Sequence, residues 1–169
     1  AYVMIEIFPK GSDISKANKV KFGIDPTFPK LHLGHLVPLR LVKKLQEEGK
    51  EVIIVLGTFT AQMGDPSGRD QTRPILSKEE VEKNADWILG QVKRILHPGF
   101  KVFRNGDVFN EMSVPELMQI VSDFTVQQMT KRDAFSKRIS DGVPIGVHEL
   151  IVPILQGTDS VRLESDIEI

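Results

Sequence analysis

The sequence of 169 residues contains no cysteine, which excludes disulfide bonds and thiolate metal sites. No apolar run approaches the roughly 20 residues that a membrane-spanning helix requires, and residues 2–9 are too short and too acidic for a secretory signal peptide. We therefore expect a cytoplasmic protein without a membrane partner. The formal net charge of −1 offers nucleic acid no broad electrostatic footprint, so such a contact would need a local basic patch.

The composition is otherwise typical of a globular protein, with 40% hydrophobic and 27% charged residues. The sequence shows no internal repeat and no low-complexity segment. A chain of this length can bury a substantial core, so we expect a single domain over residues 1–169.

The chain is organised around residues 19–35, where a strand pattern changes to a helix pattern. The first part alternates apolar and polar positions as a β-strand does, with apolar residues at Val20, Phe22 and Ile24. The prolines within residues 25–30 end this strand, because proline fixes φ and removes a backbone donor. Apolar residues then recur with helical spacing at Leu33, Leu36, Val37, Leu39, Leu41, Val42 and Leu45.

His32 and His35 lie at the start of this predicted helix, one turn apart, so both side chains can face one ligand. A helix N-terminus has unpaired N–H groups and the positive end of the helix dipole, both of which favour phosphate. Gly34 has no side chain, so a flat ligand could lie close to the backbone. An exposed helix start with two polar residues is the plainer interpretation. Zinc is disfavoured because the sequence shows no clear third ligand.

A second strand at residues 51–56 follows the helix, whose end is marked by Gly49. Strand, helix and strand form a βαβ unit with a right-handed crossover. Ligands in such sheets bind beyond the carboxyl ends of the strands, so residues 25–35 and 57–65 should share one crevice. We predict an α/β, Rossmann-like fold with a mostly parallel sheet and helices on both faces.

The remaining elements are predicted from capping signals and periodicity. Capping boxes at Ser77 and Ser113 start helices that reach about Leu96 and Asp123. A strand is expected at residues 101–105. Further helices are expected over residues 125–141 and 146–155, the second bent or shortened at its proline, and a last strand is expected around Val161 and Leu163.

Three motifs in this order resemble the bacterial tyrosyl-tRNA synthetase family, which belongs to the class I aminoacyl-tRNA synthetases. They are HLGH at residues 32–35 after GIDPT at 23–27, GDPSGR at 64–69, and LQGTDS at 155–160. The resemblance runs from about residue 19 to the end of the chain. It implies ATP-dependent activation of tyrosine to tyrosyl-adenylate and transfer to tRNA, with Mg²⁺ accompanying ATP. It also implies a homodimer formed through the helical region 123–156.

The resemblance assigns His32 and His35 to the ATP phosphates. There they would stabilise the charge that develops when a carboxylate attacks the α-phosphate. Asp25 and Gly34 are assigned to the same ATP site. Without the resemblance, Asp25 is equally well an ordinary residue of an Asp-Pro turn.

The resemblance also assigns the amino-acid pocket. Asp65 and Gln156 would bind the ammonium group, Thr60 would line the pocket, and Asp159 would accept a hydrogen bond from the phenol hydroxyl. Such an acceptor could discriminate against phenylalanine by ~10⁴–10⁵. The plainer alternatives are that Asp65 forms a turn and that Gln156 and Asp159 belong to a polar helix end.

The sequence departs from the family at Thr58, where aspartate is usual, and at Val152 and Thr158, where tyrosine is usual. It also ends at Ile169, before the segments that complete the catalytic site in the family, so we leave its enzymatic activity open. These differences suggest an alternative, an engineered or minimised non-catalytic binding scaffold with an altered substrate pocket. An NAD-dependent dehydrogenase is disfavoured because no G-x-G-x-x-G follows either early strand.

Overall fold

The computed structural model of the chain describes residues 7–63 and 76–169. Within these residues a parallel sheet has the strand order β3-β2-β1-β4. The strands are β1 (Lys19–Ile24), β2 (Glu51–Leu56), β3 (Lys101–Arg104) and β4 (Ile167–Glu168). Phe8 adds an antiparallel bridge to Glu168 at the β4 edge. The predicted α/β fold with a parallel sheet is confirmed.

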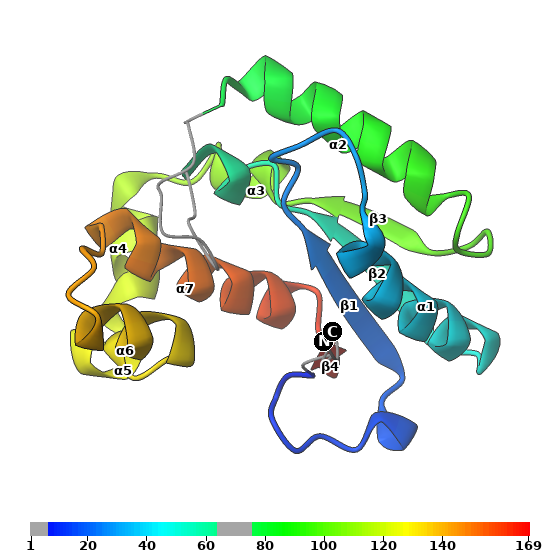
Figure 1. The fold of residues 1–169 in the computed structure, drawn as a ribbon, viewed down its shortest axis with the longest axis horizontal. Coiled ribbons are helices and arrows are strands. Elements are labelled where there is room, and N and C mark those ends of the chain that lie inside the picture. The colour runs from blue at the N-terminus through cyan, green and yellow to red at the C-terminus, as the bar shows by residue number, and fades with distance from the viewer. Residues whose placement is uncertain (1–6, 64–75) are drawn as a thin grey trace.

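One face of the sheet packs against α1 (Leu33–Glu47) and α2 (Lys78–Val92), which lie on the same side of it (Figure 1). The packing forms the main hydrophobic core, because alternate residues of β1 and β2 point to this face. The buried core residues are Phe22, Ile24, Leu39, Val42, Val52, Ile54, Leu56, Ala85, Ile88, Val92 and Leu96. The face of the sheet that packs against α1 and α2 is therefore filled by the hydrophobic core.

The opposite face of β1 carries Lys21 and Gly23, and it faces α7 (Val147–Arg162). Figure 1 shows α7 on the other side of the sheet from α1 and α2, which confirms helices on both faces. A buried lysine is unusual on a central parallel strand. The polar cavity described below lies on this face, between β1 and α7.

The remaining elements are short. They are η1 (Ile14–Lys16), η2 (Thr60–Met63), α3 (Gly106–Phe109), α4 (Val114–Ser122), α5 (Val126–Thr130) and α6 (Asp133–Ser140). Capping boxes are present at Ser77 and Ser113, as predicted, and at Thr125. Each box satisfies backbone donors that the first helical turn leaves unpaired.

The strand predicted around Val161 and Leu163 is wrong. Helix α7 continues through Pro153 to Arg162, and the last strand is β4 instead. Val161 is 80% exposed, so its apolar character does not reflect burial in a sheet. The backbone hydrogen bond lost at Pro153 is outweighed by burial of the apolar residues Val152, Ile154 and Leu155 of this helix.

Two further boundaries differ from prediction. Residues 125–141 form α5 and α6 rather than one helix, because Arg132 adopts an extended backbone between them. Helix α2 ends at Val92, and turns rather than helix lead to Leu96. The two short helices therefore bury Met129 and Phe135 from separate turns. None of the helices in the described ranges has both the length and the apolar character needed to cross a bilayer.

Candidate functional site

The two predicted histidines form the N-terminal cap of α1. His32 is the N-cap residue, and its Nδ1 accepts a hydrogen bond from the Gly34 N–H at 3.0 Å. The Nδ1 of His35 accepts from the His32 N–H at 3.3 Å, and the two rings lie 4.0 Å apart. Because each Nδ1 is an acceptor, each neutral ring carries its proton on Nε2. Both Nε2–H groups can therefore donate to an anion beyond the helix end.

Burial of His35, together with the neighbouring His32, lowers the pKa of the His35 imidazole. At neutral pH the neutral ring is thus favoured, which keeps Nδ1 available as an acceptor. Protonation would place a proton on Nδ1 and break the cap. The hydrogen bond to Nδ1 and the lowered pKa therefore both favour the neutral imidazole of His35.

A cavity of about 80 Å³ lies on the other face of the sheet, between β1, β2 and α7. Its polar lining residues are Lys21, Asp25, Thr60, Asn105, Gln156, Asp159 and Glu168. Asp25 and Thr60 follow the carboxyl ends of β1 and β2, where parallel sheets bind ligands. The structure therefore brings together the predicted residues Asp25, Thr60, Gln156 and Asp159.

Asp159 is the acidic centre of this cavity. The residue is 2% exposed, and its Oδ2 accepts a hydrogen bond from Asn105 Nδ2 at 3.2 Å. Its Oδ1 is buried without a hydrogen-bond partner among the described residues. Burial raises the pKa of the Asp159 carboxyl to about 6, although Asn105 and Lys21 both lower it and the carboxylates of Glu168 and Asp25 add to the rise. A buried oxygen of this kind is free to accept a hydrogen bond from a water molecule or from a ligand in the cavity.

Asp25 and Thr60 form the neighbouring wall. Thr60 Oγ1 donates to Asp25 Oδ1 at 2.6 Å, and Thr60 is 1% exposed. Asn105 orients this wall, because its Oδ1 accepts from the Phe59 N–H at 2.9 Å. The amide of Asn105 thus links the β2 loop to Asp159.

The sequence interpretation missed Lys21, Asn105 and Glu168. Lys21 is 1% exposed, and its Nζ lies 3.0 Å from Glu168 Oε2 and donates to the Gln156 carbonyl at 2.9 Å. The sequence did contain a signal for Lys21. It lies on β1 between apolar residues that point into the core, so its side chain must point to the opposite face of the sheet. No local signal connects Asn105 and Glu168 to the site, because only the sheet brings them beside β1.

The other predicted residues lie elsewhere. His32 lines a separate surface cavity with Leu31, Leu33, Leu36 and Ile95. Thr58 is fully buried and accepts from the Gly106 N–H at 3.0 Å. Val152 is buried within α7, and Thr158 Oγ1 donates to the Ile154 carbonyl at 2.9 Å. These last three residues do not line the Asp159 cavity. Asp65 lies outside the described residues.

Gly57 is required by the close packing of the cavity wall. A Cβ at this position would lie 1.8 Å from Asp25 Oδ1 and 2.4 Å from Thr60 Oγ1. Gly57→Ala should therefore break the Asp25–Thr60 hydrogen bond and lower the unfolding free energy by about 1–3 kcal/mol. Urea unfolding measures this change.

Gly90→Ala is the matched control, because a Cβ at Gly90 meets no atom within 4 Å. Gly90 lies inside α2, so alanine there should raise the unfolding free energy by up to about 1 kcal/mol. Equal effects of the two substitutions would contradict the close packing around Gly57.

The family comparison identifies the chain. A sequence model described as tRNA synthetases class I (W and Y) matches residues 14–169. The chain belongs to this family. It is 43% identical over 179 residues to the tyrosine–tRNA ligase of Francisella tularensis, in an alignment that covers 98% of this chain and 45% of that protein. It is also 43% identical over 152 residues to the tyrosine–tRNA ligase of Thermotoga maritima, covering 89% of this chain and 38% of that protein.

Solved structures agree with the family assignment. A C-terminally truncated mitochondrial tyrosyl-tRNA synthetase from Coccidioides posadasii matches with a TM-score of 0.69 and 25% identity, covering 86% of this chain and 43% of that chain. The chain thus spans less than half the length of these class I relatives. The alternative of an engineered binding scaffold receives no support from the comparisons, since similarity to natural ligases extends over nearly all of the chain.

Proposed function

We propose that the chain is the nucleotide- and tyrosine-binding part of a tyrosine–tRNA ligase. The observation that carries this proposal is Asp159, whose buried Oδ1 has no partner among the described residues and faces a small polar cavity at the sheet's carboxyl edge. A phenol hydroxyl is a neutral donor that can satisfy this oxygen. The parent reaction joins tyrosine to the α-phosphate of ATP, releases pyrophosphate, and transfers the tyrosyl group to tRNA.

In this proposal His32 and His35 donate their Nε2–H groups to ATP phosphate oxygens. The donors are held in place before the reaction, because both Nδ1 atoms are fixed by backbone N–H groups. Such fixed donors stabilise charge that develops on the phosphoryl oxygens during attack. Gly34 leaves the helix start open to the nucleotide, and Asp25 supports the loop between the two subsites.

The tyrosine subsite is proposed to consist of Asp159 at the hydroxyl end and Gln156 with Asp65 at the ammonium end. Thr60 holds the wall between them through its hydrogen bond to Asp25. The described part of the chain has no cluster of three or more His, Cys, Asp or Glu side chains that could hold a metal ion. We therefore propose that Mg²⁺ enters as a complex with the ATP phosphates.

The proposed assembly is a cytoplasmic homodimer with the single domain 1–169 as a unit, joined through residues 123–156. Large apolar side chains on this region are exposed, at Val126 (63%), Ile139 (51%) and Val147 (78%). Association of two protomers through this region would bury such side chains. The full-length ligase would also bind tRNA.

Calorimetric titration with ATP, with tyrosine and with a non-hydrolysable tyrosyl-adenylate analogue tests the proposal. We expect the analogue to bind more tightly than either half, because it fills both subsites at once. A folded chain that binds neither the analogue nor tyrosine would contradict it.

His32→Asn separates binding from folding at the α1 start. Asparagine is a good N-cap residue, so the unfolding free energy should change by less than about 1 kcal/mol. The variant loses the Nε2–H donor, and the analogue should bind about ten- to hundredfold more weakly.

The control is His97→Asn, because His97 is exposed, pairs with Glu47 and lines neither the His32 cavity nor the Asp159 cavity. It should leave analogue binding unchanged. Equal losses in the two variants would argue against a phosphate contact by His32.

A further inference from the structure

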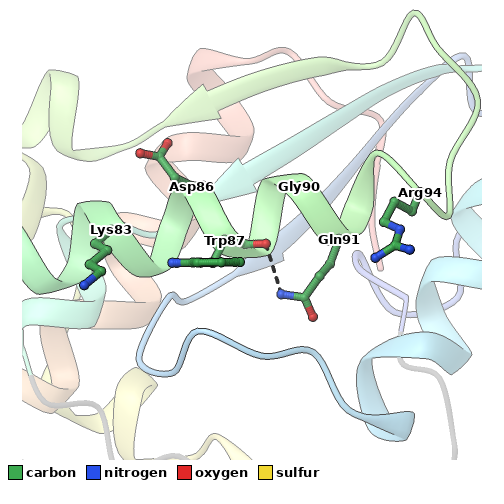
Figure 2. A pocket seen from close by; sticks show the side chains of 6 residues that line it. All are labelled: Lys83, Asp86, Trp87, Gly90, Gln91 and Arg94. Atoms are coloured by element: carbon green, nitrogen blue, oxygen red, sulfur yellow. Dashed lines mark hydrogen bonds between the residues drawn. The ribbon is translucent and has the colours of Figure 1, made fainter.

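Two cavities along α2 are larger than the Asp159 cavity, with volumes of about 470 and 810 Å³. Figure 2 shows side chains that line the first of them, where Gln91 Nε2 donates to the Trp87 carbonyl at 3.0 Å. Neither cavity shares a lining residue with the Asp159 cavity, and Trp87 is 61% exposed. The Asp159 cavity differs from both, because several of its polar side chains are buried. Buried polar groups need partners, so they indicate which ligand a cavity can take.

The β1 wall of the Asp159 cavity consists of Lys21, Gly23 and Asp25. Lys21 and Gly23 point to the same face of the sheet, because alternate residues of a strand share a face. Gly23 leaves this wall open, since a Cβ there would meet only Glu168 Oε1, at 3.8 Å. A flat ring can therefore lie beside the ammonium group of Lys21.

The ammonium group of Lys21 has one hydrogen-bond donor more than its partners use. An ammonium carries three N–H groups. The structure gives Nζ two partners, the Gln156 carbonyl at 2.9 Å and Glu168 Oε2 at 3.0 Å. The third N–H has no partner among the described residues. Because Lys21 is 1% exposed and lines the cavity, the cavity is where a ligand can supply that partner.

The two contacts of Lys21 do not by themselves explain a buried lysine on β1. The Glu168 side chain is 27% exposed, so water can solvate its carboxylate. The Gln156 carbonyl also accepts from Ser160 Oγ at 3.3 Å, so it does not depend on Lys21. Burial of a lysine charge is costly unless its partners compensate for the lost hydration. A ligand in the cavity would add a partner.

Lys21 and Asp159 are complementary groups that do not touch each other. Asp159 Oδ1 is a buried acceptor without a hydrogen-bond partner among the described residues, and the third N–H of Lys21 is a donor without one. Both residues line one cavity, yet their charged atoms lie more than 4.0 Å apart and form no ion pair. A hydroxyl group between them can accept from Lys21 and donate to Asp159, since a hydroxyl is both acceptor and donor.

We infer that Lys21 donates a hydrogen bond to the phenol oxygen of tyrosine while the phenol O–H donates to Asp159 Oδ1. The inference rests on the proposed function, because it places the side chain of tyrosine in the Asp159 cavity. Lys21 is then a specificity-determining residue. Phenylalanine would leave both a buried cationic donor and a buried acceptor unpaired, and sites of this kind discriminate strongly.

An analogue with a 4-aminophenylalanine side chain separates the two contacts. Its ring amine can donate to Asp159, but it is a poor acceptor because the nitrogen lone pair is delocalised into the ring. Calorimetric titration with non-hydrolysable adenylate analogues of tyrosine and of 4-aminophenylalanine gives the ratio of the two affinities. This ratio reports the acceptor contact to Lys21, since both side chains keep a donor for Asp159.

The test compares the wild type with the double variant Lys21→Met/Glu168→Gln. Lys21→Met alone leaves the Glu168 charge without its partner and endangers folding, whereas the double variant removes both charges. It also perturbs Asp159 least, because the Lys21 charge lowers the pKa of that carboxyl and the Glu168 charge raises it. The ratio of tyrosine to 4-aminophenylalanine affinity should fall about ten- to hundredfold in the double variant. Glu168→Gln alone should keep most of the ratio, because Lys21 remains.

The matched control is Lys19→Met. Lys19 lies on the same strand, and its Nζ donates to the Leu163 carbonyl at 3.1 Å and lies 3.8 Å from Glu164 Oε2. It does not line the Asp159 cavity. The substitution removes the same charge from β1, so the affinity ratio should stay at the wild-type value.

Three results would overturn the contact between Lys21 and the phenol oxygen. They are an unchanged ratio in the double variant, an equal fall in Lys19→Met, and an equal fall in Glu168→Gln alone. In each of them the tyrosyl analogue still binds the wild type, so the proposed function stands. A folded wild type that binds neither analogue would instead contradict the proposed function, and the inference with it.

Discussion

Asp159→Asn is expected to raise the unfolding free energy of the free chain at pH 8 and, at the same time, to weaken its recognition of tyrosine. The carboxylate is 2% exposed and carries a buried oxygen without a partner among the described residues. Asparagine has nearly the same shape and keeps a group that can accept from Asn105. It removes the cost of holding a negative charge in this environment.

The direction of the pH dependence follows from the raised pKa. Burial raises the pKa of Asp159 from 3.8 to about 6, so between these values the folded chain binds more protons than the unfolded chain. This residue's contribution to the unfolding free energy is therefore fully present below about pH 4 and is lost as pH rises through about 6. The loss at pH 8 corresponds to about 3 kcal/mol, which the asparagine variant should largely recover.

Urea unfolding of both proteins at pH 4 and pH 8 measures this difference. The two should have similar stability at pH 4, and the variant should be more stable at pH 8. Asp166→Asn is the control, and it should lower the unfolding free energy at pH 8 instead of raising it. Backbone hydrogen bonds from Lys19 and Asn18 lower the pKa of Asp166, so its carboxylate stabilises the fold. A difference between wild type and Asp159→Asn that is independent of pH would contradict the burial of a charged carboxylate.

The same variant should lose specificity for tyrosine. A charged acceptor binds a phenol hydroxyl more tightly than an amide oxygen does, so tyrosyl-adenylate analogue affinity should fall about ten- to hundredfold. A phenylalanyl analogue leaves the acceptor unpaired in the wild type, and its affinity should change far less. Calorimetry with both analogues measures the ratio of the tyrosyl analogue's affinity to the phenylalanyl analogue's affinity. An unchanged ratio would place the hydroxyl site elsewhere.

Lys21→Met is expected to destabilise the fold by about 2–4 kcal/mol and to weaken tyrosine binding at neutral pH. Methionine approximates the length of lysine but cannot bind Glu168 or the Gln156 carbonyl, which Lys21 contacts at 3.0 Å and 2.9 Å. Only Lys21 is fully buried in this pair, and the Glu168 side chain is 27% exposed, but removing Lys21 still leaves the Glu168 charge without its partner. The substitution also removes a positive charge that lowers the pKa of Asp159, so more of that carboxyl is protonated at pH 7.

A double-mutant cycle with Glu168→Gln distinguishes these effects. If the Lys21–Glu168 pair accounts for the lost stability, the double variant should recover part of it, because no unpaired charge remains. The pKa of Asp159, followed by NMR titration, should rise in Lys21→Met. No change in that pKa would show that Lys21 stabilises the fold without influencing the proposed tyrosine subsite.

The sequence predicted those parts of the fold that depend on neighbouring residues. Alternation in residues 20–24, the prolines that follow and the apolar spacing after Leu33 define β1 and α1 almost to the residue. Side-chain capping at Ser77 and Ser113 likewise defines the starts of α2 and α4. These signals are local, because a capping bond or one turn of a helix spans only a few residues.

Local signals failed where packing decides the structure. Pro153 suggested a bent or shortened helix, yet α7 continues, because its buried face anchors it against the sheet. The short strand β4 has too few residues for a recognisable alternation, and it is fixed by pairing with β1. Asp159 itself could be identified only through its resemblance to a known motif.

The sequence by itself determined the βαβ unit, the helix caps and the motifs that indicate the family. The tertiary structure alone decided that Lys21, Asn105, Asp159 and Glu168 meet in one cavity. It also decided that Glu82 and Asp86 of α2 pair with Arg104 of β3. The physical reason is that charge balance and burial depend on which distant segments the sheet places side by side, and no local pattern encodes that placement.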